Sequence, residues 1–436
     1  MHDVNYRMQK IHVIGGGTIS PIRAHFALNR VDANGHATSA IAYGKTARKI
    51  AHLCREKWGQ DEVHLHLTKM ACCGESDLET NEDIQALVKK IIQDPDSKVL
   101  FMPAALVDFE GTVIDGHTST LSGRDEPRLQ TKEGEHLLRL IPAPKVISEV
   151  RKYRKDLFLV GFKETSGKSP DALYVSSLDL LKRASCNLVF GNDMKARLNM
   201  VVTPEQARYH VTEDRDEALT GLVEMAHARS SLKFTRSTIV GGRPVPWSSP
   251  DIPEAFREVM NHCVKGGAYR PFLGKTVGHG AVKLSKDTFL TTIRGSDFNH
   301  SDKVGLVLVE AVGNDTVIAH GAKPSVGGQS QRSIFADHPE IDCIAHFHSK
   351  IRPGSEVPVR SQREYECGSH ECGANTSTGM KQFGDVWAVM LDRHGPNVAF
   401  SRNVDPRRVI EFIEANFDLP AGTDDLPRRE MPHGDP

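Results

Sequence analysis

The stretch IAHFH at residues 344–348, followed later by LDRHG at residues 391–395, decides how the carboxyl-terminal half of this chain folds. Side chains two residues apart on an extended strand project to the same side, so His346 and His348 can both point at one ion. His394 follows a second apolar run at residues 386–391, which predicts another strand. Three neutral imidazoles with an open fourth position are typical of a catalytic zinc site and not of a closed structural one.

The spacing alone leaves a plainer interpretation open. The chain contains 21 histidines, so a chance His-x-His is easy to meet, and a second such pair stands at His64 and His66. For that second pair we predict a structural role, because no third ligand follows it in a suitable context.

Three short motifs surround the first pair in a fixed order. They are AKPS at residues 322–325 ahead of a helix-like stretch, HPEI at residues 338–341, and RHG at residues 393–395. This order resembles the class II aldolase/adducin family, in which a Pro-Ser turn, a His-Pro bend, a His-x-His strand and an Asn-His-Gly turn follow one another. The resemblance covers about residues 253–416 and implies a class II aldolase-like α/β domain.

The same resemblance implies a site and an activity. It assigns Zn2+ or another divalent metal to His346, His348 and His394, and substrate or phosphate binding to Thr292, Gly295 and Ser325. It also implies lyase chemistry of the aldehyde-lyase type. Members of the family usually form tetramers with sites at subunit interfaces, so we expect a homo-oligomer.

Two positions depart from the family's pattern. Gly327 stands where active members carry a glutamate that acts as general acid or base, and GHGA at residues 278–281 stands where they carry Asn-x-Ser. A metal site without its usual base argues for different chemistry or a different substrate. Glu364, Glu366 and Glu371 follow the ligand strand and could supply a carboxylate, although loop glutamates are usually solvated surface.

The amino-terminal half has the pattern of a nucleotide-binding α/β domain. The apolar strand KIHVI at residues 10–14 runs directly into GGGT at residues 15–18, where glycines let the backbone approach a phosphate. An ordinary strand-to-loop turn is the alternative, because the Gly-x-Gly-x-x-Gly fingerprint is absent. Strands and helices then alternate, which predicts a parallel sheet wrapped by helices. The predicted strands are 62–68, 99–102, 157–162 and 187–190, and the predicted helices are 79–92, 144–153 and 172–184.

Five motifs of this half also occur in a fixed order over about 190 residues. They are GGTISPI at 16–22, FALNRVDANG at 26–35, ALVDF at 105–109, GFKET at 161–165 and GND at 191–193. Together they resemble the phosphopantothenate–cysteine ligase (DFP-type) family. That resemblance implies activation of a carboxylate as a nucleotidyl ester of CTP or ATP with Mg2+, after which an amine displaces the nucleotide to give an amide.

The ligase resemblance assigns roles to residues at the ends of two strands and in one loop. The nucleotide-binding residues would be Gly16, Gly17, Thr18, Asn29, Asn192 and Asp193, with Asn29 also steadying the acyl-nucleotide. Strand ends of this kind are where open α/β sheets bind ligands. The family's lysine that faces the acyl phosphate is missing, and Arg124 is the candidate to replace it. The segment APK at residues 143–145 leaves the choice between CTP and ATP open.

Composition limits the class of protein. A chain of 436 residues suits two domains. The balance of 55 Lys and Arg against 56 Asp and Glu favours neither nucleic acid nor a membrane surface as partner. No apolar run approaches the roughly 18 residues of a membrane helix, and the polar start lacks a signal-peptide core. Eight cysteines without paired spacing predict a reducing cytoplasm.

We therefore predict two domains: a Rossmann-like, ligase-like nucleotide-binding domain at 1–232 and a class II aldolase-like metal domain at 253–418. A linker at 233–252, rich in Gly, Pro and Ser, would join them, and 419–436 would be a loose tail. The predicted function is a bifunctional cytoplasmic enzyme that acts on small molecules. The alternative is a non-catalytic adducin-like or nucleotide-binding regulatory or scaffold protein, which the missing glutamate at Gly327 permits.

Overall fold

The computed structural model describes residues 9–31, 37–38, 42–115, 118–119, 122–313, 315–325 and 328–422. Gly327, part of the motif at 26–35 and most of the predicted tail lie outside these residues. The chain divides into two compact units. The first comprises Met1–Lys168, Ser176–Val202 and His210–Ser230, and the second comprises Ser169–Val175, Thr203–Tyr209 and Ser231–Pro436.

The first unit is built on a seven-stranded sheet in the order β14-β13-β12-β11-β7-β1-β6. In chain order these strands are β1 Lys10–Gly15, β6 Val63–Leu67, β7 Ser97–Phe101, β11 Phe158–Thr165, β12 Leu188–Asp193, β13 Asn199–Val202 and β14 Arg208–Thr212. β1 is parallel to β6 and β7, and β11 is parallel to β7 and β12. Parallel neighbours need crossover connections, which the intervening helices supply. The predicted parallel α/β fold is confirmed.

The helices of the first unit are α1 Lys45–Trp58, α2 Asn81–Gln93, α3 Val150–Tyr153 and α5 Arg215–Ser230, together with the greater part of α4 Pro170–Ala184. The helix α2 starts with a capping box, in which the Thr80 hydroxyl accepts from the Asp83 amide and the Asp83 carboxylate accepts from the Thr80 amide. The helix predicted over 144–153 was too long. The structure has a 3-10 turn at Val146–Glu149 and then the single turn of α3.

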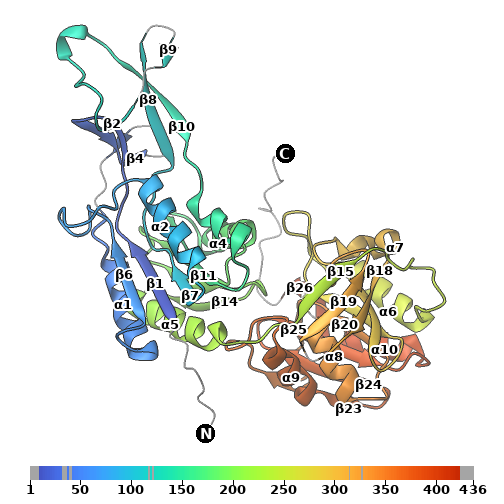
Figure 1. Cartoon of the computed structure of the whole chain (residues 1–436). Coiled ribbons are helices and arrows are strands. Elements are labelled where there is room, and N and C mark those ends of the chain that lie inside the picture. Colours follow the sequence, from blue (N-terminus) through green and yellow to red (C-terminus); the bar gives the residue numbers. More distant parts are fainter. Residues whose placement is uncertain are drawn as a thin grey trace. The chain divides into compact units, whose positions relative to one another are not determined.

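An antiparallel extension leaves the parallel sheet of the first unit. Its three-stranded part pairs β8 Phe109–Asp115 with β10 Leu137–Pro142 and β9 Thr118–Ser119, and Figure 1 shows β8 and β10 reaching away from the sheet. Two short hairpins accompany it: β2 Ser20–Arg23 with β3 Phe26–Leu28, and β4 Arg30–Val31 with β5 Ala37–Thr38. Ile22, Leu28 and Val113 form its small buried core. This extension was not among the elements predicted from the sequence.

The second unit is built on a ten-stranded sheet, in which β15-β19-β18-β17-β16-β20-β25-β24-β22 are neighbours and β23 pairs with β24. The strands are β15 Arg236–Val240, β16 His279–Lys283, β17 Thr288–Thr292, β18 Leu306–Ala311, β19 Thr316–His320, β20 Cys343–His346, β22 Val359–Arg360, β23 Lys381–Phe383, β24 Val386–Leu391 and β25 Gly395–Phe400. Most neighbours are antiparallel, and the two parallel pairs are β15 with β19 and β22 with β24.

Two strands of the second unit lie wholly or partly beyond the bounds predicted for the aldolase-like domain. β15 lies inside the predicted linker, and its β-branched run RSTIV pairs with β19. β26 (Phe417–Gly422) pairs with β21 (Ser349–Ile351), so ordered structure continues into the start of the predicted tail. Turn-forming residues around β15 concealed a strand whose partner lies far away in the sequence.

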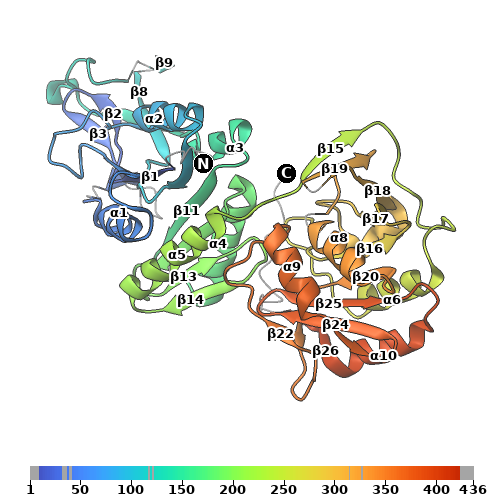
Figure 2. The same cartoon turned by 60° about the horizontal axis from the view of Figure 1, so that its bottom comes forward.

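Helices cover both faces of the second sheet. α6 (Glu254–Lys265) and α10 (Pro406–Asn416) lie on one side, and α8 (Gly328–Asp337) and α9 (His370–Gly379) lie on the other, as Figure 2 shows. Along β20, Cys343 and Ala345 belong to the core under α6 and α10, whereas Ile344 belongs to the core under α8. Because side chains alternate along a strand, His346 faces the α8 side.

None of the described helices combines the length and the apolar character that crossing a bilayer requires. All eight cysteines are free thiols.

Candidate metal centre and candidate nucleotide site

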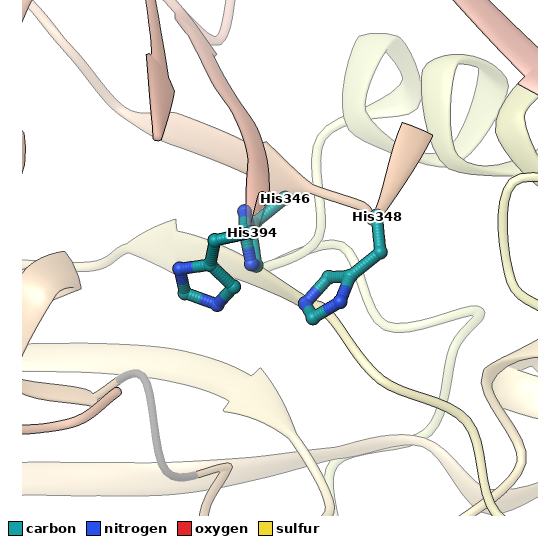
Figure 3. Close-up of side chains that lie close together, drawn as sticks. All are labelled: His346, His348 and His394. Atoms are coloured by element: carbon teal, nitrogen blue, oxygen red, sulfur yellow. The ribbon is translucent and has the colours of Figure 1, made fainter. Parts of the chain in front are cut away.

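The three histidines of the opening motifs lie together. β20 ends at His346, His348 lies just before β21, and His394 lies in the turn between β24 and β25. One ring nitrogen from each falls within 4.8 Å of the others, and Figure 3 shows the three rings converging. The ring centroids are 4.7 to 5.1 Å apart. All three side chains are buried, so the cluster is an internal site and not a chance surface grouping.

Gly395 makes this approach possible. Its φ is +136°, and a Cβ placed there would lie 2.1 Å from the carbonyl oxygen of Phe347 and 3.0 Å from the Cα of His348. Only glycine lets the hairpin turn that carries His394 come this close to the end of β20. Gly278 has the same function on the other side of β20, since its Cβ would lie 2.5 Å from the carbonyl oxygen of His346.

The surroundings of His346 suit a metal ligand. Its Nδ1 lies 2.8 Å from the carbonyl oxygen of Pro396, a hydrogen bond that only a protonated Nδ1 can make, so Nε2 is left with a lone pair. Nε2 is buried and has no hydrogen-bond partner among the described residues. Burial, followed by the neighbouring imidazoles, lowers the pKa of His346 well below its usual value. The ring is therefore neutral at pH 7, the form that binds metal. The residues present fit a divalent ion.

His346 also lies in a row of polar side chains that crosses three strands. Across the β16–β20 pairing it is opposite His279, and across the β20–β25 pairing it is opposite Asn397. The rings of His279 and His346 have centroids 4.8 Å apart. His279 is 3% exposed and Asn397 is 2% exposed. From the sequence, His279 is only part of the segment that departs from the aldolase-like pattern, because nothing in the sequence shows which strands are neighbours.

The predicted phosphate-binding residues lie on two loops that the sheet brings together. Ile293 and Pro324 form an isolated bridge, and the amide of Ser325 donates to the carbonyl oxygen of Thr292 at 2.9 Å. The Thr292 hydroxyl accepts from the amide of Gly280, the residue after His279. Gly295 has a φ of +77° in the same turn. Thr292, Gly295 and Ser325 are therefore neighbours at the end of β17, two strands from β20.

Two of the glutamates that could have replaced the missing acid or base make contacts away from the triad. Glu364 accepts from the Ser361 hydroxyl and from Arg363, and Glu371 accepts from the amide of Lys233. Among the described His, Cys, Asp and Glu side chains, the only group of three or more with metal-binding spacing is the histidine triad. No glutamate of the described chain therefore completes it.

Close packing in the turn after β1 requires glycine at positions 16 and 17. A Cβ on Gly16, whose φ is +99°, would lie 2.1 Å from Thr68 Oγ1, and a Cβ on Gly17 would lie 2.7 Å from Met70 Sδ. The loop after β6 thus lies directly against the turn. Asn29 is placed at the same loop, with its amide nitrogen 3.9 Å from Met70 Sδ.

Thr18 does not present its polar groups outward. Its side chain is fully buried, and its hydroxyl donates to Asn81 Oδ1 at 2.7 Å and accepts from the Val107 amide at 3.0 Å. Its own amide donates to the carbonyl oxygen of Ala105. The amide and the hydroxyl of Thr18, a residue predicted to bind nucleotide, thus join β1 to the start of α2 and to the segment after β7.

At the carboxyl end of β12, the Asp193 side chain is also used in hydrogen bonds within the fold. The Asp193 carboxylate accepts from the amides of Gly167, Lys168 and Ala196 and from the Thr165 hydroxyl. These hydrogen bonds, with the Ala196 amide first, hold the pKa of Asp193 well below its usual range. Asn192 is 4% exposed. Asp193 is therefore an anchor for the loop after β11.

Arg124 forms ion pairs in this structure. Its guanidinium lies 2.6 Å from Glu79 and 3.6 Å from Asp83, and its side chain is 49% exposed. The Glu79 side chain is only 19% exposed, whereas the guanidinium of Arg124 remains half-exposed to solvent.

A third histidine, His12, accompanies His64 and His66 and was not predicted from the sequence. His12 is opposite His64 across the parallel β1–β6 pairing, and its Nδ1 lies 3.1 Å from His66 Nε2. His12 Nε2 lies 3.0 Å from the Ser97 hydroxyl. Both ring nitrogens of His12 thus have partners inside the fold, which agrees with a structural cluster.

Comparisons with known proteins give partial matches. No family model matches the chain. The coenzyme A biosynthesis bifunctional protein CoaBC of Thermococcus kodakarensis is 28% identical over 121 residues, which are 28% of this chain and 27% of that protein. The match thus spans only about a quarter of the curated relative's length.

Solved structures similar to this chain match its two halves separately. The DNA/pantothenate metabolism flavoprotein from Streptococcus pneumoniae has a TM-score of 0.36 and 19% identity, covering 50% of this chain and 96% of that one. L-fuculose 1-phosphate aldolase has a TM-score of 0.29 and 20% identity, and the match covers 38% of this chain and 83% of that one. YgbL from Klebsiella pneumoniae, described as a putative aldolase/epimerase/decarboxylase, has a TM-score of 0.27 and 21% identity, covering 36% and 84%. These neighbours thus include two kinds of protein, which match different halves of the chain.

Proposed function

We propose that this chain is a two-part enzyme of small-molecule metabolism. Its second unit would be a zinc-dependent, aldolase-like lyase of the aldehyde-lyase type, and its first unit a nucleotide-dependent carboxylate–amine ligase-like domain. The lyase proposal for the second unit rests on one observation: the ring nitrogens of His346, His348 and His394 converge within 4.8 Å in a buried site. Three imidazoles suit zinc, although related divalent ions use the same ligands.

The residues of the second unit have separable tasks in this proposal. A divalent ion held by the triad would supply a Lewis acid for a carbonyl or hydroxyl oxygen. The Pro396 carbonyl fixes the ring of His346 and its tautomer. Burial keeps that ring neutral and excludes water from it. The loops that carry Thr292 and Ser325 would bind the polar end of the substrate.

An aldol-cleavage screen tests the lyase part. Zinc-loaded full-length protein would be incubated with phosphorylated and free ketoses and with hydroxylated 2-oxo acids, and released aldehyde would be measured. We expect release from at least one substrate class, and we expect His348→Ala to abolish it. His320→Ala serves as the control, because His320 lies on β19 and contacts Glu310. A zinc-loaded protein that cleaves none of these substrates would favour the scaffold alternative.

The ligase-like part rests on the position of the predicted residues and on the curated relative. Gly16, Gly17 and Asn192 lie at the carboxyl ends of β1 and β12, the edge where parallel α/β sheets bind ligands. The relative that matches 121 residues is named as a coenzyme A biosynthesis protein. CTP or ATP with Mg2+ would be the cofactor, and Arg124 would contribute a cation once it leaves Glu79.

A nucleotide titration tests the ligase-like part. CTP or ATP with Mg2+ should raise the melting temperature of the full-length protein, and a suitable carboxylate should then release pyrophosphate. Asn29→Ala should stop amide formation, whereas Asn261→Ala, an exposed position on α6 in the other unit, should not. A thermal shift without turnover would indicate that the first unit binds nucleotide but is not a ligase. The absence of any shift or heat with both nucleotides would refute both versions.

The proposal includes a cytoplasmic homo-oligomer whose partners are small-molecule substrates, with no nucleic acid and no membrane. Light scattering at micromolar concentration measures the assembly directly. A 48.1 kDa monomer would contradict an oligomer.

A further inference from the structure

The row that crosses β16, β20 and β25 contains more polar groups than three metal ligands require. Directly opposed residues of antiparallel strands project to the same face, so His279, His346 and Asn397 all face the α8 side. His279 Nδ1 and Asn397 Oδ1 are buried and have no hydrogen-bond partner in the part of the chain that the structure describes. Buried polar atoms are nearly always hydrogen-bonded in native proteins, so unpartnered ones beside a metal site indicate a ligand.

His279 stands beside the triad without belonging to it. The group whose ring nitrogens lie within 4.8 Å of one another contains His346, His348 and His394, and the ring of His279 has its centroid 4.8 Å from that of His346. An imidazole in this position can touch a molecule bound at the triad while leaving the set of metal ligands unchanged.

The sequence gives a second, independent reason. Where the aldolase-like pattern has a glutamate this chain has Gly327, and where the pattern has the asparagine of Asn-x-Ser it has His279. The chain thus lacks the glutamate of the pattern and has an imidazole in place of its asparagine. A neutral imidazole offers one N–H and one lone pair, whereas a carboxylate offers acceptors alone.

We propose that His279 is a substrate-recognition residue, whose imidazole N–H donates to an oxygen of the molecule bound at the triad. This inference rests on the proposed function of the second unit. The rings of His279 and His346 have centroids 4.8 Å apart, so the ligand that we expect is a small molecule with two oxygens close together, one for the triad and one for His279.

Acetohydroxamate, which carries oxygens on adjacent atoms, is the probe. Its affinity for zinc-loaded full-length protein would be measured by calorimetry, together with the zinc content of each variant. His279→Leu and His279→Ala remove the donor, His279→Asn restores an N–H, and His320→Asn on β19 is the control for the same substitution in the same sheet. We expect unchanged zinc in all four, at least a tenfold loss of affinity in the two donor-less variants, and partial recovery in His279→Asn.

The outcomes separate this inference from the proposed function. Wild-type protein without zinc would refute the metal centre, and the role of His279 with it. Zinc-loaded wild-type protein that does not bind acetohydroxamate, or donor-less variants that bind it as tightly as wild type, would overturn the role of His279 alone. Loss of zinc from folded His279→Ala would make His279 a metal ligand, which also overturns the recognition role.

Discussion

Replacing Gly395 with alanine should separate His394 from the other two histidines. The added Cβ would lie 2.1 Å from the carbonyl oxygen of Phe347, whereas ordinary contact begins at 3.4 Å, so the two atoms must move about 1.3 Å apart. Both are fixed to backbone, and no side-chain rotation relieves the clash. Metal sites tolerate ligand displacements of about 0.2 Å. We therefore expect Gly395→Ala to weaken zinc binding at least about 100-fold.

The same substitution also strains the backbone. A residue with a side chain at φ +136° costs about 1–3 kcal/mol in addition to the clash. Gly384→Ala is the matched control, because Gly384 has a φ of +61° in the turn before β24 and nothing lies within 4 Å of its Cβ position. Unfolding with excess chelator measures the cost to the fold, and competition with a chelating dye measures zinc affinity. Gly395→Ala with wild-type zinc affinity would refute the reasoning.

Three further predictions concern the first unit. Burial and then the neighbouring imidazoles lower the pKa of His12 to about 3, and burial lowers that of His66 to about 4. Below pH 6.5 the unfolded chain therefore binds protons that the fold does not, and each imidazole should lower stability by up to about 2 kcal/mol between pH 7 and pH 5. Urea unfolding at both pH values should show a smaller loss for His12→Gln, and an equal loss would contradict this. Thr80→Ala should cost about 1 kcal/mol by removing the capping box, so an unchanged urea midpoint would count against it. Asp193→Ala should lower the urea midpoint by freeing the loop after β11, and a weaker nucleotide affinity at unchanged stability would point instead to direct binding.

The histidine spacing could predict the triad because the direction of side chains along a strand is a local property of the backbone. A His-x-His on a strand puts two imidazoles on one side, and the third was found through a motif after an apolar run that forms β24. The strand itself ends at His346 and does not reach His348, yet the rings still converge. The role of Gly395 depends on its distance from Phe347, which no local pattern contains.

Contacts between distant segments could not be predicted. Thr18 is adjacent to glycines in a turn that could hold a phosphate, but its hydroxyl bonds Asn81 and the Val107 amide, 63 and 89 residues away. His12 completes the cluster with His66 because β1 and β6 are parallel neighbours. His279 meets His346 for the same kind of reason, through the pairing of β16 with β20. Burial of polar groups depends on strand order, and strand order depends on the whole fold.

Metal content tests the central claim most directly. Full-length wild-type protein and the His346→Ala/His348→Ala double variant would be purified without chelators, dialysed against trace zinc and measured by elemental analysis. His262→Ala/His300→Ala, two histidines outside the triad, controls for the loss of imidazoles as such. Three buried imidazoles around one position predict about one zinc ion per chain in the wild type and in the control, and almost none in the double variant. Equal metal content in wild type and double variant would contradict the account.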